Sequence, residues 1–80
     1  MKIPAIKKLV EIYSIEELKK AEDAIVEGLT LPIDIEGEDE GEQLTHALAA
    51  SWIKNEMQTR DLEFKDALRE YTKRVRASIS

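Results

Sequence analysis

Cysteine is missing from this 80-residue sequence. Without a thiol, the chain has no disulfide framework, no thiolate nucleophile and no cysteine-ligated zinc site. It therefore cannot itself be a thiol redox catalyst. The absence of cysteine does not by itself identify the cellular compartment.

Glycine and long apolar runs are also scarce. The three glycines stand at an expected helix end or in a connector, so there is no glycine-rich phosphate loop, Walker motif or nucleophile elbow. Charged residues interrupt the N-terminus from Lys2 onward before a signal-like apolar stretch develops, and no run approaches the roughly 18 residues of a membrane span. We expect a cytoplasmic protein.

What the sequence does contain is the composition of a small globular domain. Hydrophobic residues make up 42% and charged residues 36%, enough for a core and a soluble surface. A chain of this size buries only roughly 60–65% of its unfolded surface, which leaves a thin margin over conformational entropy. We therefore expect one domain over residues 1–80, and we favour self-association as a homodimer.

Hydrophobic periodicity predicts an all-α fold, a small bundle of three to four helices. The expected helices span residues 3–13, 15–27, 40–58 and 62–78. Ser14 and Glu17 form a capping-box pattern before the second helix, and Gly28 suits the left-handed position after it. The third helix is apolar around much of its circumference, so we expect it to be central.

Two stretches of the chain allow more than one structure. Apolar residues nearly keep phase from the third helix into the fourth, so one long bent helix is an alternative to a separate fourth helix capped by Asp61. Residues 29–36 alternate apolar and polar side chains, which indicates one extended segment. Without a partner strand, this segment either lies as an arm across the helices or pairs with its copy in a second subunit.

Acidic charge is concentrated in one segment, residues 34–42, which holds six acidic residues and no basic one. We call it the acidic segment; its part 37–41 is the acidic connector. The net charge is -5, so the rest of the chain sums to +1. Asp39 and Glu42 have the spacing of an N-terminal helix cap, whereas the EF-hand glycine is missing. We prefer to interpret the acidic segment as a solvated connector whose negative charge stabilises the N-terminus of the third helix.

No residues form a catalytic motif, so we assign no catalytic or cofactor-binding residues and favour a protein that is not an enzyme. Four residues are weak candidates for metal ligands: Glu38, Asp39, Glu42 and His46. They are weak because zinc sites normally take three or four protein ligands, and the single histidine with one glutamate on its helix face supplies only two. We favour a half-buried or capping role for His46. Ser51 lies on the alanine-rich face of the third helix, where we expect it to permit close packing.

Two further groups are candidates for binding. The first is a basic cluster near the C-terminus, made of Lys73, Arg74 and Arg76. It could contact phosphate or an acidic partner. We favour the simpler role, in which these charges complement the dipole at the end of the last helix. Trp52 stands among small alanines and either fills the core, which we favour, or anchors an interface.

Three stretches of the sequence resemble a family of short, uncharacterised proteins from Bacteroidetes-type bacteria, known as a domain of unknown function. They are MKIPAIKKLVE at residues 1–11, GEDEGEQLTH at 37–46 and ALREYTKRVRASI at 67–79. The resemblance covers nearly the whole chain. It implies a stand-alone bacterial cytoplasmic protein with no assigned site residues. Related members that lie beside genes for thioredoxin-like proteins and peroxiredoxins imply an accessory role in thiol redox metabolism.

These observations lead to three hypotheses. The leading one is a non-catalytic interaction or accessory module, a homodimer that also binds a protein partner; the partner-binding candidates are Glu38, Asp39, Glu40, Glu42 and Trp52. The alternative is a metal-responsive or weakly catalytic protein that uses the acidic connector and His46. The third is an acidic mimic of nucleic acid that occupies a basic protein groove. We expect no cofactor, no nucleic-acid ligand and no membrane association.

Overall fold

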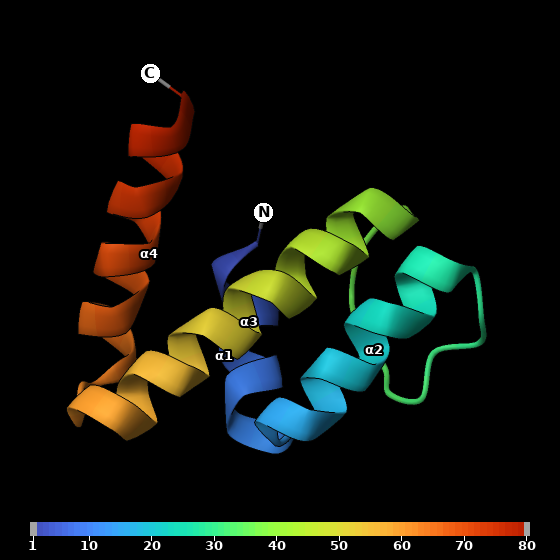
Figure 1. The fold of residues 1–80 in the computed structure, drawn as a ribbon, viewed down its shortest axis with the longest axis horizontal. Helices are drawn as coiled ribbons and strands as arrows, with labels where there is room; N and C mark the ends of the chain where they lie inside the picture. Colours follow the sequence, from blue (N-terminus) through green and yellow to red (C-terminus); the bar gives the residue numbers. More distant parts are fainter. Residues whose placement is uncertain (1, 80) are drawn as a thin grey trace.

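The computed structural model of the protein describes residues 2–79, which form four α-helices and no strand. The helices are α1 (Ile3–Ile12), α2 (Ile15–Glu27), α3 (Glu40–Arg60) and α4 (Phe64–Ile79). α3 is the central element, against which each of the other three packs (Figure 1). The expectation of a small all-α bundle is confirmed. Within the described chain, no helix is both long and apolar enough to cross a membrane.

α2 begins and ends at the predicted capping residues. Ser14 Oγ accepts the Glu17 N–H at 3.2 Å, and the Glu17 carboxylate accepts the Ser14 N–H at 3.0 Å. This reciprocal pair is the predicted capping box. Gly28 ends α2 with a left-handed backbone, at φ 72°, as predicted. α1 ends at Ile12, one residue earlier than expected, and Tyr13 takes the cap position.

α3 and α4 are separate helices, so the alternative of one bent helix is wrong. α3 continues to Arg60, two residues beyond the expected end. Asp61 does not start the fourth helix; it ends α3, with φ 53° in the left-handed region. Aspartate enters this region more readily than most residues because its short polar side chain bonds locally. α4 therefore begins only at Phe64, after the left-handed residue has interrupted the helical backbone.

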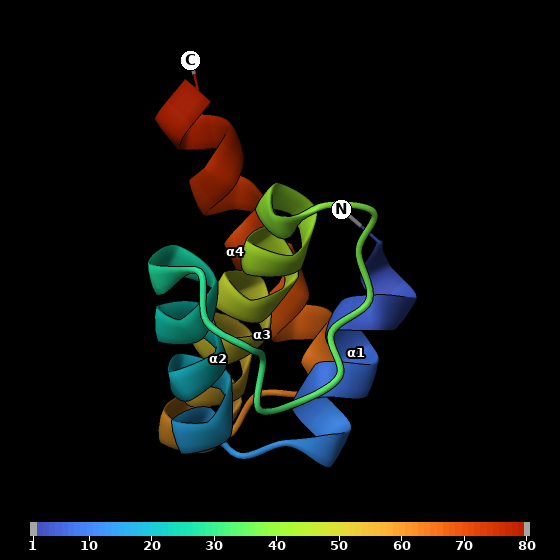
Figure 2. The same cartoon turned by 90° about the vertical axis from the view of Figure 1, so that its right-hand side faces the viewer.

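Residues 29–36 lie as an arm across the helices and form no strand in the described chain (Figure 2). Ile35 is buried, and Leu31 and Ile33 are partly buried against the core, so the predicted alternation does place these side chains inward. Leu29, by contrast, is exposed. Gln43 Nε2 donates to the Ile35 carbonyl at 3.1 Å and ties the arm to α3.

The core lies along α3, which supplies mostly small side chains to it. Its buried members are Ile6, Leu9, Val10, Leu18, Ala21, Ile25, Ile35, Ala47, Ala49, Ala50, Ile53 and Ala67. The alanines of α3 are excluded from solvent, so the neighbouring helices can approach its backbone closely. Lys54 Nζ donates to the carbonyls of Val10 and Tyr13 at 2.8 and 2.7 Å, which satisfies carbonyl groups at the end of α1 that have no partner within the helix.

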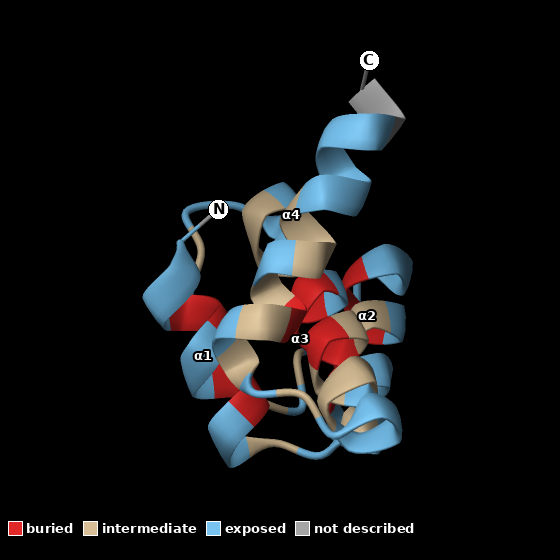
Figure 3. Cartoon of the chain, turned by 90° about the vertical axis from the view of Figure 1, so that its left-hand side faces the viewer, coloured by how far each residue is buried: buried red, intermediate tan, exposed pale blue. Residues whose placement is uncertain are grey.

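α4 joins this core only through its first half. Ala67 is fully buried, and Phe64, Leu68 and Tyr71 are partly buried against the core. Residues 73–77 are all exposed, and this part of the helix extends beyond the rest of the bundle (Figure 3).

Candidate interaction site

His46 is fully buried and bonded at both ring nitrogens. The Lys2 N–H donates to Nε2 at 3.0 Å. Because Nε2 accepts, the neutral ring carries its proton on Nδ1, which donates to the Glu36 carbonyl at 2.7 Å. Of the half-buried and capping roles that we expected, the half-buried one is wrong, since the start of α1 and the chain before α3 close over the ring. Neither nitrogen can bind a metal or move a proton unless one of these bonds breaks.

The acidic segment is partly used for local structure. The Asp39 carboxylate accepts the Glu42 N–H at 2.8 Å, as the cap pattern predicted, and the Glu42 carboxylate accepts the Glu38 N–H at 3.2 Å. Glu36 forms an ion pair with Lys8 at 3.7 Å. Across residues 2–79, the structure brings no three His, Cys, Asp or Glu side chains into a group that could hold a metal ion. It therefore does not unite Glu38, Asp39, Glu42 and His46 in one site.

Ser51 links two helices. Its side chain is almost buried, and Oγ donates to Glu22 Oε1 of α2 at 2.6 Å. The sequence pattern showed the close packing of this residue but not its partner. Glu22 stands 29 residues earlier among other charged residues, so nothing local distinguishes it from a solvated glutamate.

Trp52 lies at the rim of the core, partly buried against it. Its ring is tilted 49° against that of Tyr71, with the ring centres 5.7 Å apart. The Arg74 guanidinium carbon lies 5.4 Å from the centre of the indole, within the range of a cation–π contact. Trp52 therefore joins α3 to α4 and still keeps part of its surface open.

Two hollows flank Trp52, and together they make one face that runs from α2 to α4. We call it the Trp52 face. The hollow between α2 and α3 has a volume of about 270 Å³ and is lined by Ile15, Lys19, Glu22, Leu48, Ser51, Trp52 and Asn55. The hollow between α3 and α4 has about 290 Å³ and is lined by Trp52, Glu56, Arg60, Glu70, Lys73 and Arg74. The first hollow combines three apolar side chains with polar and charged ones. In the second, every lining side chain other than Trp52 is charged.

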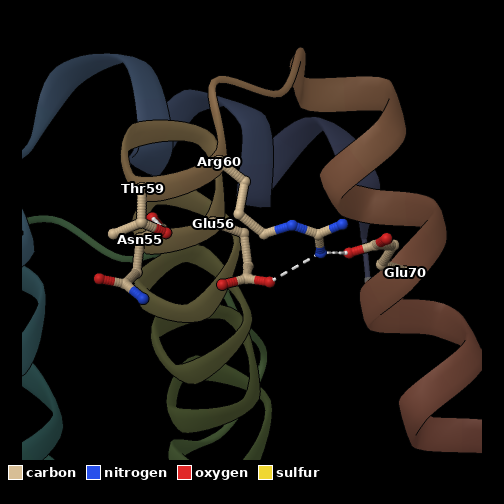
Figure 4. Close-up of polar contacts among 5 residues, drawn as sticks. All are labelled: Asn55, Glu56, Thr59, Arg60 and Glu70. Carbon is tan, nitrogen blue, oxygen red and sulfur yellow. Dashed lines mark hydrogen bonds and ion pairs between the residues drawn. The ribbon is translucent and has the colours of Figure 1, made fainter.

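Arg60 links α3 to α4 beside the second hollow. Its Nη1 donates to the carboxylate of Glu56, one turn earlier, at 3.2 Å and to the carboxylate of Glu70 on α4 (Figure 4). The hydrogen bond to Glu70, followed by that to Glu56, raises the pKa of the guanidinium above its ordinary value. Burial likewise raises the pKa of the neighbouring Tyr71 above 10.0.

The predicted partner-binding residues fall on two separate surfaces. Glu38, Asp39, Glu40 and Glu42 lie at the start of α3, and Trp52 lies in its middle. From Glu40 to Trp52 the helix rises about 18 Å, at 1.5 Å per residue. Leu48 is the residue that the sequence reasoning missed: it is 46% exposed and borders the first hollow. Its position one turn before Trp52 was the available signal, because residues four apart lie on the same face of a helix.

Comparison with curated proteins gives no match, and comparison with solved structures gives none either. The profile of a family described as "Family of unknown function (DUF6952)" matches residues 1–80, the whole length of the sequence. This match confirms the prediction that the chain is a member of a family of unknown function. The chain belongs to the Family of unknown function (DUF6952).

Proposed function

We propose that this chain is a non-catalytic accessory protein that binds a protein partner through the Trp52 face. One observation carries the proposal: Leu48 and Trp52 stay partly exposed beside a hollow of about 270 Å³. An aromatic or aliphatic anchor beside a hollow with a polar rim is the usual composition of a protein-binding site. The side chains best suited to chemistry, His46 and Ser51, are instead bonded internally.

The partner that fits this hollow is an amphipathic helix with one large apolar side chain and a nearby carboxylate. Ile15, Leu48 and Trp52 supply the apolar border that receives the side chain. Lys19 is exposed at the rim and supplies the charge that the carboxylate matches. Glu22 at the same rim already accepts the Ser51 hydroxyl, so the positive group dominates the polar recognition.

The test is a matched pair of variants, Leu48→Asp and Leu29→Asp, used as tagged proteins in a pull-down from host lysate. Leu48 is 46% exposed on the Trp52 face, and Leu29 is 61% exposed outside it. We expect Leu48→Asp to lose a partner that the wild type and Leu29→Asp both retain. Equal recovery of the same proteins by all three would refute the proposal. Circular dichroism checks that each variant is folded.

The identity of the retained partner tests the pathway. A thioredoxin-like protein or a peroxiredoxin, lost only in Leu48→Asp, would support the accessory role in thiol redox metabolism that the sequence resemblance implies. Because the chain has no cysteine, its contribution there is binding and not thiol chemistry. A specific partner without a thiol centre would contradict the role in thiol redox metabolism but would still support the Trp52 face as the interaction site.

A further inference from the structure

The C-terminal half of α4 is a projecting helical end. Residues 73–77 are exposed, although Arg74 lies over Trp52, and α4 packs mainly on α3, through its first half (Figure 3). Short helical segments without tertiary contacts are only marginally stable in water. A helix end of this kind therefore gains stability when another surface covers it. Val75, 36% exposed, offers such a surface an apolar contact.

This projecting end carries a concentrated positive charge. It contains Lys73, Arg74 and Arg76 and no acidic residue. Arg74 lies over the Trp52 ring, whereas Lys73 and Arg76 make no ion pair within residues 2–79. Without these three cations the net charge of the chain would be -8 instead of -5. The projecting end is therefore a cationic element on an otherwise acidic molecule.

The acidic segment offers the complementary charge. Asp34, Glu38 and Glu40 are exposed, and their carboxylates make no ion pair within the described part of the chain. α4 stands at one end of the long axis, and the arm and the start of α3 lie toward the other (Figure 1). The two charged surfaces therefore do not meet within one chain, but two copies can bring them together.

We propose that this protein pairs with a second copy of itself, the projecting end of α4 of each copy lying against the acidic segment of the other. Since each copy supplies both surfaces, the contact forms twice in a closed pair. The inference shares with the proposed function the role of an interaction module. Its surface includes Lys73 and Arg74 at the edge of the α3–α4 hollow but not the α2–α3 hollow, which stays open for a partner.

The exposed area of the chain agrees with such a pairing. The surface measures 5320 Å² for a mass of 9.1 kDa, whereas a compact monomer of that mass exposes about 4,900 Å². A stable interface covers about 800 Å² on each partner, and we expect each copy to bury an area of this order at the two contacts.

The test uses two charge-reversed variants and their mixture, measured by sedimentation over a concentration series. In the first variant, Lys73→Glu and Arg76→Glu make the helix end acidic. In the second, Asp34→Lys, Glu36→Lys, Glu38→Lys and Glu40→Lys change the net charge of the segment from -6 to +2 and make it basic. We expect each variant alone to weaken pairing about tenfold or more. Mixed in equal amounts, they should pair again, because both contacts are then complementary.

A control with Lys20→Glu and Lys65→Glu carries the same change in net charge as the first variant, at sites outside both surfaces, and should pair like the wild type. Salt at about 1 M, where screening shortens to about 3 Å, should dissociate the wild-type pair without unfolding it. A wild-type protein that is monomeric throughout the series, or variants that fail to pair when mixed although circular dichroism shows them folded, would overturn the inference.

Leu48→Asp separates this inference from the proposed function. This variant should still sediment with the mass of the homodimer, but it should no longer bind the protein partner of the Trp52 face. If instead Leu48→Asp dissociates the pair, the Trp52 face is the dimer surface and the inference is wrong. Failure to capture any partner, with pairing intact, would count against the proposed function alone.

Discussion

His46 connects three segments of the chain, and its replacement tests directly how this fold is held together. His46→Ala removes the acceptor of the Lys2 N–H and the donor to the Glu36 carbonyl, which lie 44 and 10 residues away in sequence. It also empties the space of a ring that is fully excluded from solvent. The start of α1 and the chain before α3 would both lose their side-chain tie to the central helix.

The expected loss of stability follows from these contacts. A buried backbone group left without a partner costs about 1–3 kcal/mol. Because Lys2 and Glu36 are exposed residues whose backbone groups water can partly reach, the lower end applies to each. Emptying part of a buried site adds about 1 kcal/mol or more. We therefore expect His46→Ala to lower the free energy of unfolding by about 3 kcal/mol, a large share of the roughly 4–12 kcal/mol typical for 80 residues.

Urea denaturation followed by circular dichroism measures this loss, and two further variants assign its cause. His46→Leu keeps an apolar side chain in the space but has no polar atom, so we expect it to recover the cavity part and remain about 2 kcal/mol less stable than wild type. His46→Gln can donate and accept, and we expect it to lie between Leu and wild type. A His46→Leu protein as stable as the wild type would refute the reasoning, because the two hydrogen bonds would then contribute nothing.

Two further predictions concern the backbone of α2 and the surroundings of Trp52. Gly28→Ala should lower the free energy of unfolding by about 1 kcal/mol through the left-handed backbone alone, since no atom lies within 4 Å of an added Cβ; an unchanged melting temperature would contradict this. Burial raises the pKa of Tyr71 above 10.0 in the folded protein. As the pH rises, the unfolded chain therefore loses the phenol proton before the folded chain does. The contribution of the protonated phenol to stability is complete below pH 10.0 and is lost as the pH rises through the raised pKa. Tyr71→Phe should therefore reduce the fall in unfolding free energy above that pH; an equally steep fall in both proteins would show that this phenol has no part in it.

The sequence by itself determined the helices and most of their ends. Ser14 with Glu17, Asp39 with Glu42, and Gly28 act on backbone groups within a few residues, so their roles can be recognised from spacing alone. Asp61 shows where this reasoning fails. Its side chain suits both the start of one helix and the left-handed end of another, and the local pattern does not distinguish these two roles.

Only the tertiary structure decided what the polar side chains of α3 do. His46 bonds to Lys2 and Glu36, and Ser51 bonds to Glu22. Spacing along a helix shows which residues share a face, but it does not show which distant segment will cover that face. For the same reason Trp52 and Leu48 could not be placed from sequence: their exposure depends on where α2 and α4 lie against α3, and that is set by the packing of all three helices around small alanines.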